Sequence, residues 1–238
     1  LNGGYDFGNG ANAVNPDDVE SMTILKGAAA TALYGSRAAS GVVMITTKTG
    51  KKNKGLGIEY NGGLQWSTIL RLPEFQNEFG MGWNGDHTEL ENGSWGPRFD
   101  GSMQLWGNRY ENSQKLKPYS PIKDNIRDFF DAGFRYNNSV SFNGATDRSE
   151  YYVSFSQISD NGMIPTDADS YDKYTFSARG SHKVKALTFS SSLNYSYQKN
   201  KFATTGQGLT MLNSLYQTPR DISIISLQNQ DDIFNSPG

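Results

Sequence analysis

Apolar and polar residues alternate along most of the chain after Gly55, and this period of two predicts β-strands. In the run that starts at Ile58, one set of positions is mostly apolar, while the alternate set contains no apolar side chain. The same pattern returns later, and two weaker runs bring the number of expected strands to five. The expected strands cover residues 58–66, 134–142, 151–158, 174–180 and 187–197.

The connections between these expected strands alternate between short and long. Only 144–150 and 181–185 are short, whereas 67–133, 159–173 and the residues after Gln198 are long. Outer-membrane barrels have this arrangement, with tight periplasmic turns and long outer loops. A half-buried soluble sheet shows the same alternation, so the connections favour a membrane barrel over a soluble sandwich without excluding the latter. Five strands do not close a barrel, so we expect further strands in a longer chain.

The first 50 residues differ in composition and predict a small α/β region. Asn15-Pro16-Asp17-Asp18 reads as a turn that starts a helix, with a cap residue, a proline and acids in the first turn. Beyond it we expect a short strand at 22–25, a short helix at 28–34 and a buried strand at 41–48. Lys51, Lys52 and Lys54 then form a basic turn.

Charge and composition exclude several classes of protein. The 22 basic and 24 acidic residues give a net charge of −2, which is against a nucleic-acid-binding protein. The absence of cysteine excludes disulfides, thiol catalysis and cysteine zinc sites. No run of 18 apolar residues predicts a transmembrane helix, which leaves a β-barrel possible. Leu1 follows no signal sequence, so we expect a piece of a longer chain.

Catalytic and cofactor-binding motifs are scarce, so we expect neither an enzyme nor a resident cofactor or metal. Lys26 precedes Gly27 and no GK[ST] exists, so the glycines in this region are better explained by close packing than by a phosphate loop. His87 and His182 are far apart and fit no recognised metal or nucleophile spacing. Three nearby aspartates lack the turn glycine and terminal glutamate of a calcium loop: Asp167, Asp169 and Asp172.

The long connection 67–133 holds three of the four tryptophans and the residues we consider for substrate binding. Aromatic faces flanked by polar groups suit sugar or peptide recognition. The favoured alternative is that the tryptophans form the small core that so long a loop needs. Residues 121–131 predict a short amphipathic helix that seats the end of this loop on the barrel rim. The candidates are Trp83, Trp95, Trp106, Arg109 and Tyr110.

Residues 15–50, "NPDDVESMTILKGAAATALYGSRAASGVVMITTKTG", resemble the end of the plug domain of TonB-dependent outer-membrane transporters. More narrowly, they resemble the SusC/RagA-like family, and later segments such as "LPEFQNEFG" and "SWGPRFDG" resemble the first barrel segments of that family. The motif residues, to which we assign a structural role, are Asp18, Glu20, Gly27, Tyr34, Gly35, Arg37 and Gly41. Because Arg37 lies among alanines inside a barrel, we expect an acid to pair with it.

The resemblance implies a mostly β fold: a segment of an antiparallel transmembrane β-barrel, 22-stranded in the family, preceded by the end of a small α/β plug. We expect the plug to end within 1–50, a periplasmic link at 51–55 and barrel strands with long outer loops over 56–238. Residues 41–48 are expected to anchor the plug to the wall.

The resemblance also implies a function and partners. The function is TonB-dependent import of oligosaccharides or oligopeptides across the outer membrane of a Gram-negative cell. The implied partners are a SusD-like surface lipoprotein, outer-membrane lipid, and TonB with its inner-membrane energising complex, bound through a segment outside this sequence. The alternative is a soluble or secreted β-domain that binds carbohydrate through its aromatic loops.

Overall fold

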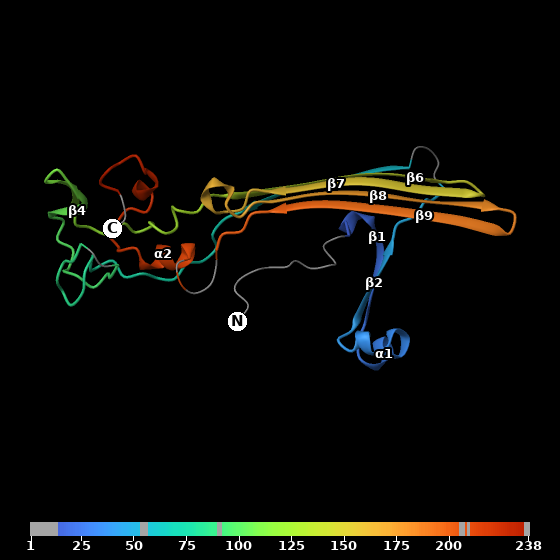
Figure 1. Ribbon diagram of the computed structural model, residues 1–238, viewed down its shortest axis with the longest axis horizontal. Helices are drawn as coiled ribbons and strands as arrows, with labels where there is room; N and C mark the ends of the chain where they lie inside the picture. Colours follow the sequence, from blue (N-terminus) through green and yellow to red (C-terminus); the bar gives the residue numbers. More distant parts are fainter. Residues whose placement is uncertain (1–13, 53–56, 90–91, 205–207, 209, 236–238) are drawn as a thin grey trace.

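A five-stranded antiparallel sheet forms the long central part of the computed structural model (Figure 1). The structure describes residues 14–52, 57–89, 92–204, 208 and 210–235. The strand order is β3-β6-β7-β8-β9, so each strand after β6 pairs with its predecessor. This confirms the five expected strands. Their bounds are β3 Ile58–Ser67, β6 Gly133–Ala145, β7 Ser149–Asp160, β8 Tyr171–Val184 and β9 Leu187–Asn200.

The two faces of this sheet are chemically opposite. The strand registers place five apolar residues in one row across the sheet: Tyr60, Val140, Phe155, Phe176 and Tyr195. The next row is polar and lies on the other face: Asn61, Ser139, Ser156, Thr175 and Ser196.

The burial of these two faces is inverted relative to a half-buried soluble sheet. In the apolar row, the side chain of Phe155 is 45% exposed and that of Tyr195 is 60% exposed. In the polar row, Ser139, Ser156 and Thr175 are buried. A barrel wall with lipid outside and a polar interior has this pattern, because its apolar side chains need no protein cover. Among the described residues the wall is open, since β3 and β9 each pair along one edge only.

A two-stranded antiparallel ribbon projects from the sheet and carries a short helix at its far end (Figure 1). Its elements are η2 Pro16–Asp18, β1 Val19–Leu25, α1 Ala28–Tyr34, η3 Ser36–Ala38 and β2 Val42–Thr47. The strands and the helix expected in this region are confirmed. The expected burial of the second strand is wrong. Among the described residues β2 pairs with β1 alone, and its Val43 side chain is 54% exposed.

A separate lobe lies beyond one end of the sheet and joins the two longest connections (Figure 1). It contains β4 Met103–Tyr110, β5 Ser113–Pro118, α2 Met211–Gln217 and η5 Ser226–Gln228, while η4 Pro165–Asp167 lies in the β7–β8 connection. Its buried core is formed by Ile126, Leu215 and Ile224. Partly buried residues pack around that core: Leu72, Phe75, Phe129, Phe130, Met211 and Leu212.

Two expectations about the lobe are wrong. Residues 121–131 form a series of turns and no helix, because the side-chain amide of Asn125 bonds to the backbone of a distant segment. Its Nδ2 donates to the carbonyl of Ile222 over 2.6 Å, and its Oδ1 accepts from the N–H of Ile224 over 2.9 Å. The tryptophans do not form the core either, since Trp83 is 46% exposed and Trp95 is 55% exposed. Among the described residues, no helix is long and apolar enough to cross a membrane.

Candidate functional site

The ribbon is fastened to the polar face of the sheet through the carboxylate of Asp18, which is 1% exposed. Its two oxygens accept hydrogen bonds of 2.9 Å from the Tyr152 hydroxyl and 2.9 Å from the Ser154 hydroxyl. The guanidinium of Arg179 lies 3.9 Å from the same carboxylate. Tyr152 and Ser154 are two apart on β7 and therefore share a face, and Arg179 lies opposite Tyr152 on β8. We call this group the plug–wall junction.

Local sequence explains why Asp18 is held in this position. The side chain of Asn15 caps the short η2 turn by accepting from the N–H of Asp17 over 3.2 Å, and Pro16 supplies the fixed φ of a helix start. The amide of Asn15 also donates to the Ser139 hydroxyl over 3.4 Å. The turn therefore presents two polar side chains, from Asn15 and Asp18, to two neighbouring strands of the sheet.

The end of β2 returns to the same place. The N–H of Lys48 donates to the carbonyl of Asp18 over 2.8 Å, and its ammonium lies 3.2 Å from the carboxylate of Glu59 on β3. The carbonyl of Lys48 accepts from Arg179 over 3.4 Å. The start of β1 and the end of β2 thus both meet the sheet, while the opposite end of the ribbon, which carries α1, extends away from it (Figure 1).

The link that follows β2 lies against the turn end of the sheet. A Cβ added to Gly50 would lie 2.3 Å from the carbonyl oxygen of Gly144 and 2.6 Å from the backbone nitrogen of Tyr151, so only glycine allows this approach. The ammonium of Lys51 lies 3.1 Å from the carboxylate of Glu20. Lys52 pairs with Asp147. The rest of the expected link, including Lys54, lies outside the described residues.

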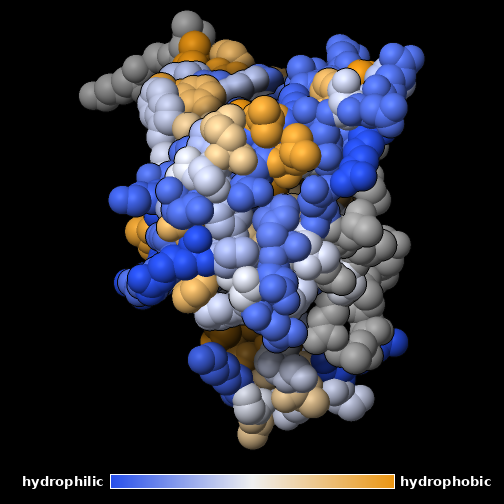
Figure 2. Space-filling model, turned by 90° about the vertical axis from the view of Figure 1, so that its left-hand side faces the viewer, coloured by the Kyte–Doolittle hydropathy of each residue, from blue (hydrophilic) through white to orange (hydrophobic). Residues whose placement is uncertain are grey.

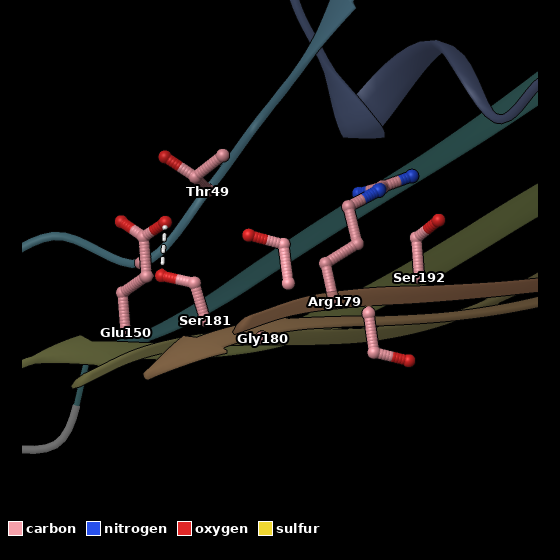
Figure 3. Close-up of a pocket in the computed structure, with 9 residues that line it drawn as sticks. Thr49, Glu150, Arg179, Gly180, Ser181 and Ser192 are labelled. Carbon is pink, nitrogen blue, oxygen red and sulfur yellow. Dashed lines mark hydrogen bonds between the residues drawn. The ribbon is translucent and has the colours of Figure 1, made fainter. Parts of the chain in front are cut away.

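A cavity of about 280 Å³ separates this link from the wall (Figure 3). It is lined by Thr49, Gly50, Glu150, Arg179, Gly180, Ser181 and the serines 190–192. Glu150 accepts a hydrogen bond of 3.0 Å from Ser181 (Figure 3). Arg179 donates to the side-chain oxygen of Asn194 over 3.1 Å. Hydroxyl, carboxylate and guanidinium groups suit a wet cavity rather than an apolar ligand.

The remaining motif residues lie along the ribbon. Tyr34 donates its hydroxyl to the Met44 sulfur over 3.3 Å, which ties α1 to β2. Gly41 has φ of 102°, and a Cβ there would lie 3.0 Å from the carbonyl of Leu25. Gly27 and Gly35 flank α1 as its caps. Arg37 is exposed, and no acid among the described residues pairs with it, so the expected partner is not found there.

The five substrate candidates fall into two groups in the lobe. Trp83 and Trp95 lie in adjacent turns: the N–H of Trp95 donates to the carbonyl of Gly82 over 3.0 Å, and the Trp95 ring lies 5.9 Å from that of Phe79. The other three candidates lie on β4: Trp106, Arg109 and Tyr110. Within the described residues, no hydrogen bond or ring contact joins the two groups.

The lobe surface at this end is largely hydrophilic, with small hydrophobic patches (Figure 2). Trp106 faces the ammonium of Lys115 at 5.7 Å, so part of its ring is occupied within the lobe. Trp83 and Trp95 are the more accessible rings.

Two charged residues that the sequence patterns did not single out hold the lobe together. Arg220 is 4% exposed and donates to the carbonyl of Gln76 over 3.0 Å and to the Asn77 side chain over 2.8 Å. Burial lowers the pKa of Arg220, although an arginine stays charged under these conditions. Asp221 accepts from the N–H of Met81 over 2.8 Å and pairs with Lys117.

Tyr119 is buried beside this pair and donates to the carbonyl of Pro97 over 2.8 Å. Burial, together with the negative charge of Asp221, raises the pKa of Tyr119 to about 12. The tyrosine therefore stays neutral at every physiological pH. Arg220 and Asp221 sit next to each other in "TPRDIS", a stretch with no motif, so only the "RD" pair in an otherwise uncharged run could have drawn attention.

The comparisons with known proteins agree with this arrangement. Residues 1–42 match the model of the TonB-dependent Receptor Plug Domain. The chain is 28% identical over 203 residues to the TonB-dependent receptor SusC of Bacteroides thetaiotaomicron, covering 84% of this chain and 18% of SusC. It is 27% identical over 232 residues to the TonB-dependent receptor P26 of Formosa agariphila, covering 94% of this chain and 20% of P26. The resemblance to the SusC/RagA-like TonB-dependent receptors is confirmed.

A solved structure supports the fold. The chain matches a chain of the RagAB peptide importer in the closed-closed state with a TM-score of 0.57 and 22% identity, covering 85% of this chain and 25% of that one. The expected fold class is therefore confirmed: a mostly β, antiparallel barrel-wall segment preceded by part of a plug. The chain spans about a fifth of the length of the curated relatives named above.

Proposed function

We propose that this chain forms the end of the plug and the first wall strands of an outer-membrane transporter. The plug would end at about residue 50, the link would cover 51–55 and the wall would start at 56. The observation that carries the proposal is the plug–wall junction, in which Asp18 reaches the polar face of a sheet whose apolar face is exposed. A plug seated inside a polar barrel needs such contacts.

The proposed activity is energy-coupled import of bulky nutrients, either oligosaccharides or oligopeptides. A TonB-type protein would pull on plug sequence outside this chain, and a SusD-like surface lipoprotein would present the substrate. The matched relatives are named TonB-dependent receptors, and one matched structure is described as a peptide importer. Catalysis has no part in this proposal.

Uptake by living cells tests the activity. Cells that carry the full-length gene are given fluorescent oligosaccharides and oligopeptides, and the same cells without a functional TonB protein serve as the control. We expect uptake of one substrate class that is lost without TonB and without the gene. Equal uptake in all three strains contradicts the proposal, and a free monosaccharide or amino acid checks that general metabolism is intact.

A matched pair of substitutions separates the transporter from the alternative, a soluble carbohydrate-binding domain. Leu193 is 58% exposed on the apolar face of β9, and Ser196 lies on the polar face of the same strand. In a membrane, Leu193→Arg puts a charge against lipid near the middle of the apolar band at a cost of about 2–4 kcal/mol, while Ser196→Arg faces the interior. We expect only the first to reduce the folded protein in the outer membrane. A soluble domain would tolerate both, because each side chain already faces water.

A further inference from the structure

The apolar face of the sheet ends close to the turns that join its strands. On β9 the outward side chains run from Leu187 to Tyr197, ten residue steps that span about 33 Å along the strand. At the tilt of about 40° that barrel strands adopt, this corresponds to a height of about 25 Å, which matches the apolar band of an outer-membrane barrel. The β8–β9 turn therefore lies at the boundary of that band.

Two cations occupy the turns directly beyond this boundary, and we call Arg148 and Lys185 the cationic rim. Both are exposed. The β6–β7 and β8–β9 turns that carry them are neighbours, because the N–H of Lys183 donates to the carbonyl of Arg148 over 2.7 Å. Both turns lie at the end of the sheet opposite the lobe (Figure 1).

The acids near this rim are already engaged. Asp147 pairs with Lys52, which lowers the pKa of that carboxyl and keeps it ionised. Glu150 accepts a hydrogen bond from Ser181 on the inner face. Within the described ranges, no acid forms an ion pair with any residue of the cationic rim. The rim therefore presents an excess of positive charge.

Apolar side chains continue up to these cations on the outward face. Val184 is 45% exposed, Leu187 is 64% exposed and Phe189 is 62% exposed. On the same face, the hydroxyl of Ser149 and the Nδ1 of His182 lie 2.7 Å apart and add polar groups at the boundary. An apolar surface that ends in uncompensated cations is complementary to the acyl chains and the anionic phosphate of one phospholipid molecule.

We propose that the cationic rim binds the headgroups of anionic phospholipids, of the phosphatidylglycerol class, in the leaflet at the turn end of the barrel. This inference rests on the proposed function, because it requires the sheet to be part of a membrane wall. The lipid would hold the turn end at a fixed depth, and therefore also the plug–wall junction and the link that packs on these turns.

The test uses the full-length protein in nanodiscs of phosphatidylcholine alone or with phosphatidylglycerol, and measures the unfolding temperature. We expect phosphatidylglycerol to raise this temperature for the natural protein. In Arg148→Gln/Lys185→Gln, the rise should fall by at least half. In Arg71→Gln/Lys123→Gln, which removes two exposed cations from the lobe, it should be unchanged. Arg148→Lys/Lys185→Arg keeps the charge and should keep the rise.

Several outcomes overturn the proposal. A full rise in the rim variant, or an equal loss in the lobe variant, shows that the rim is not the lipid site. If inorganic phosphate stabilises the protein in neutral detergent as much as the lipid does, the rim is a site for free anions. If the rim variant does not assemble, the unfolding temperature of the natural protein is measured in 1 M salt instead. Salt screens exposed charges and should therefore abolish the rise caused by phosphatidylglycerol. A protein that folds and responds to the lipid but imports nothing contradicts only the proposed function.

Discussion

The hydroxyl of Tyr152 donates a 2.9 Å hydrogen bond to the carboxylate of Asp18, which joins the ribbon to β7 of the sheet. Tyr152 is 1% exposed, so the bond is shielded from water. A hydrogen bond to a charged group in such surroundings contributes about 1.5–3 kcal/mol. The seat of the plug therefore depends on a few buried polar contacts, which substitution can remove one at a time.

Tyr152→Phe should loosen the plug without unfolding the barrel, because it deletes one donor to Asp18 and leaves the ring in place. We expect a several-fold rise in the entry of a large antibiotic such as vancomycin into cells, at an unchanged amount of protein in the outer membrane. Tyr151→Phe is the matched control, since Tyr151 is 53% exposed on the other face. Identical antibiotic sensitivity in the two variants would contradict this role of Tyr152.

Gly50→Ala should displace the link from the wall. The new methyl group would lie 2.3 Å from a backbone oxygen, and backbone cannot move aside as a flexible side chain can. We expect faster cleavage of the link by added protease in isolated outer membranes. Gly180→Ala lines the same cavity but meets its nearest atom at 3.4 Å, an ordinary contact. It should behave like the natural protein, and equal cleavage in all three proteins would count against a tight approach at Gly50.

Arg220→Gln should separate the two loops of the lobe. The substitution leaves the carbonyl of Gln76 without its donor and cannot reach the amide of Asn77, so we expect a loss of about 3 kcal/mol. Hydrogen exchange over residues 76–81 in the connection before β6 and over residues 219–226 after β9 should rise together. Arg98→Gln, which removes an exposed ion pair with Glu78, should cost less than about 1 kcal/mol. Rapid exchange confined to one loop would show that Arg220 does not join them.

The hairpin β4–β5 should lose its contact with the end of the chain in acid. A hydrogen bond from Lys115 to Asp232, with a further one from the N–H of Phe234, lowers the pKa of the Asp232 carboxyl. A lowered pKa in the folded state means that this contact stabilises the fold above the ordinary aspartate pKa, about 3.9, and is lost as the pH falls below it. Hydrogen exchange in β5 should therefore increase below about pH 4.

Asp232→Asn is the control for that titration. The amide cannot ionise, so exchange in β5 should be raised already at pH 6 and should change less between pH 6 and pH 3.5 than in the natural protein. If the variant and the natural protein show the same pH dependence, another group controls the contact.

Trp83→Ala/Trp95→Ala tests the accessible pair of substrate candidates. If these rings contact substrate, uptake of the transported class should fall at least tenfold, since stacking of an aromatic ring on a ligand contributes on the order of 1–2 kcal/mol for each ring. Trp106→Ala is the comparison, because Lys115 covers part of that ring. Unchanged uptake in the double variant, with normal assembly, would remove these two residues from consideration.

The sequence predicted the wall well because alternation is a local signal. Each strand of the main sheet shows it over several residues, and the short turns fix the pairing of β6 with β7 and of β8 with β9. The hairpin β4–β5 escaped prediction because Leu105 and Trp106 are adjacent and the register shifts between Trp106 and Tyr110. At 121–131 the apolar spacing predicted a helix, but the hydrogen bonds of Asn125 to a distant segment prevailed.

The site was predicted in part. The resemblance singled out Asp18, but its partners Tyr152 and Ser154 are 134 and 136 residues further along the chain. Nothing in the local sequence links such positions, because the register of the strands alone brings them together. Arg220 is a similar case, since its acceptors lie 143 and 144 residues earlier, and its burial depends on the packing of two loops.

The joining of the two loops in the lobe has a consequence for how proteins of this architecture diversify. Short turns set the pairing of the wall strands, so a loop at the opposite end can change length and sequence without disturbing them. Arg220 and Asp221, however, come from one loop and find their partners in the other. The two loops therefore have to be exchanged and inherited as one cassette, because a recombinant that receives only one of them buries charges without partners.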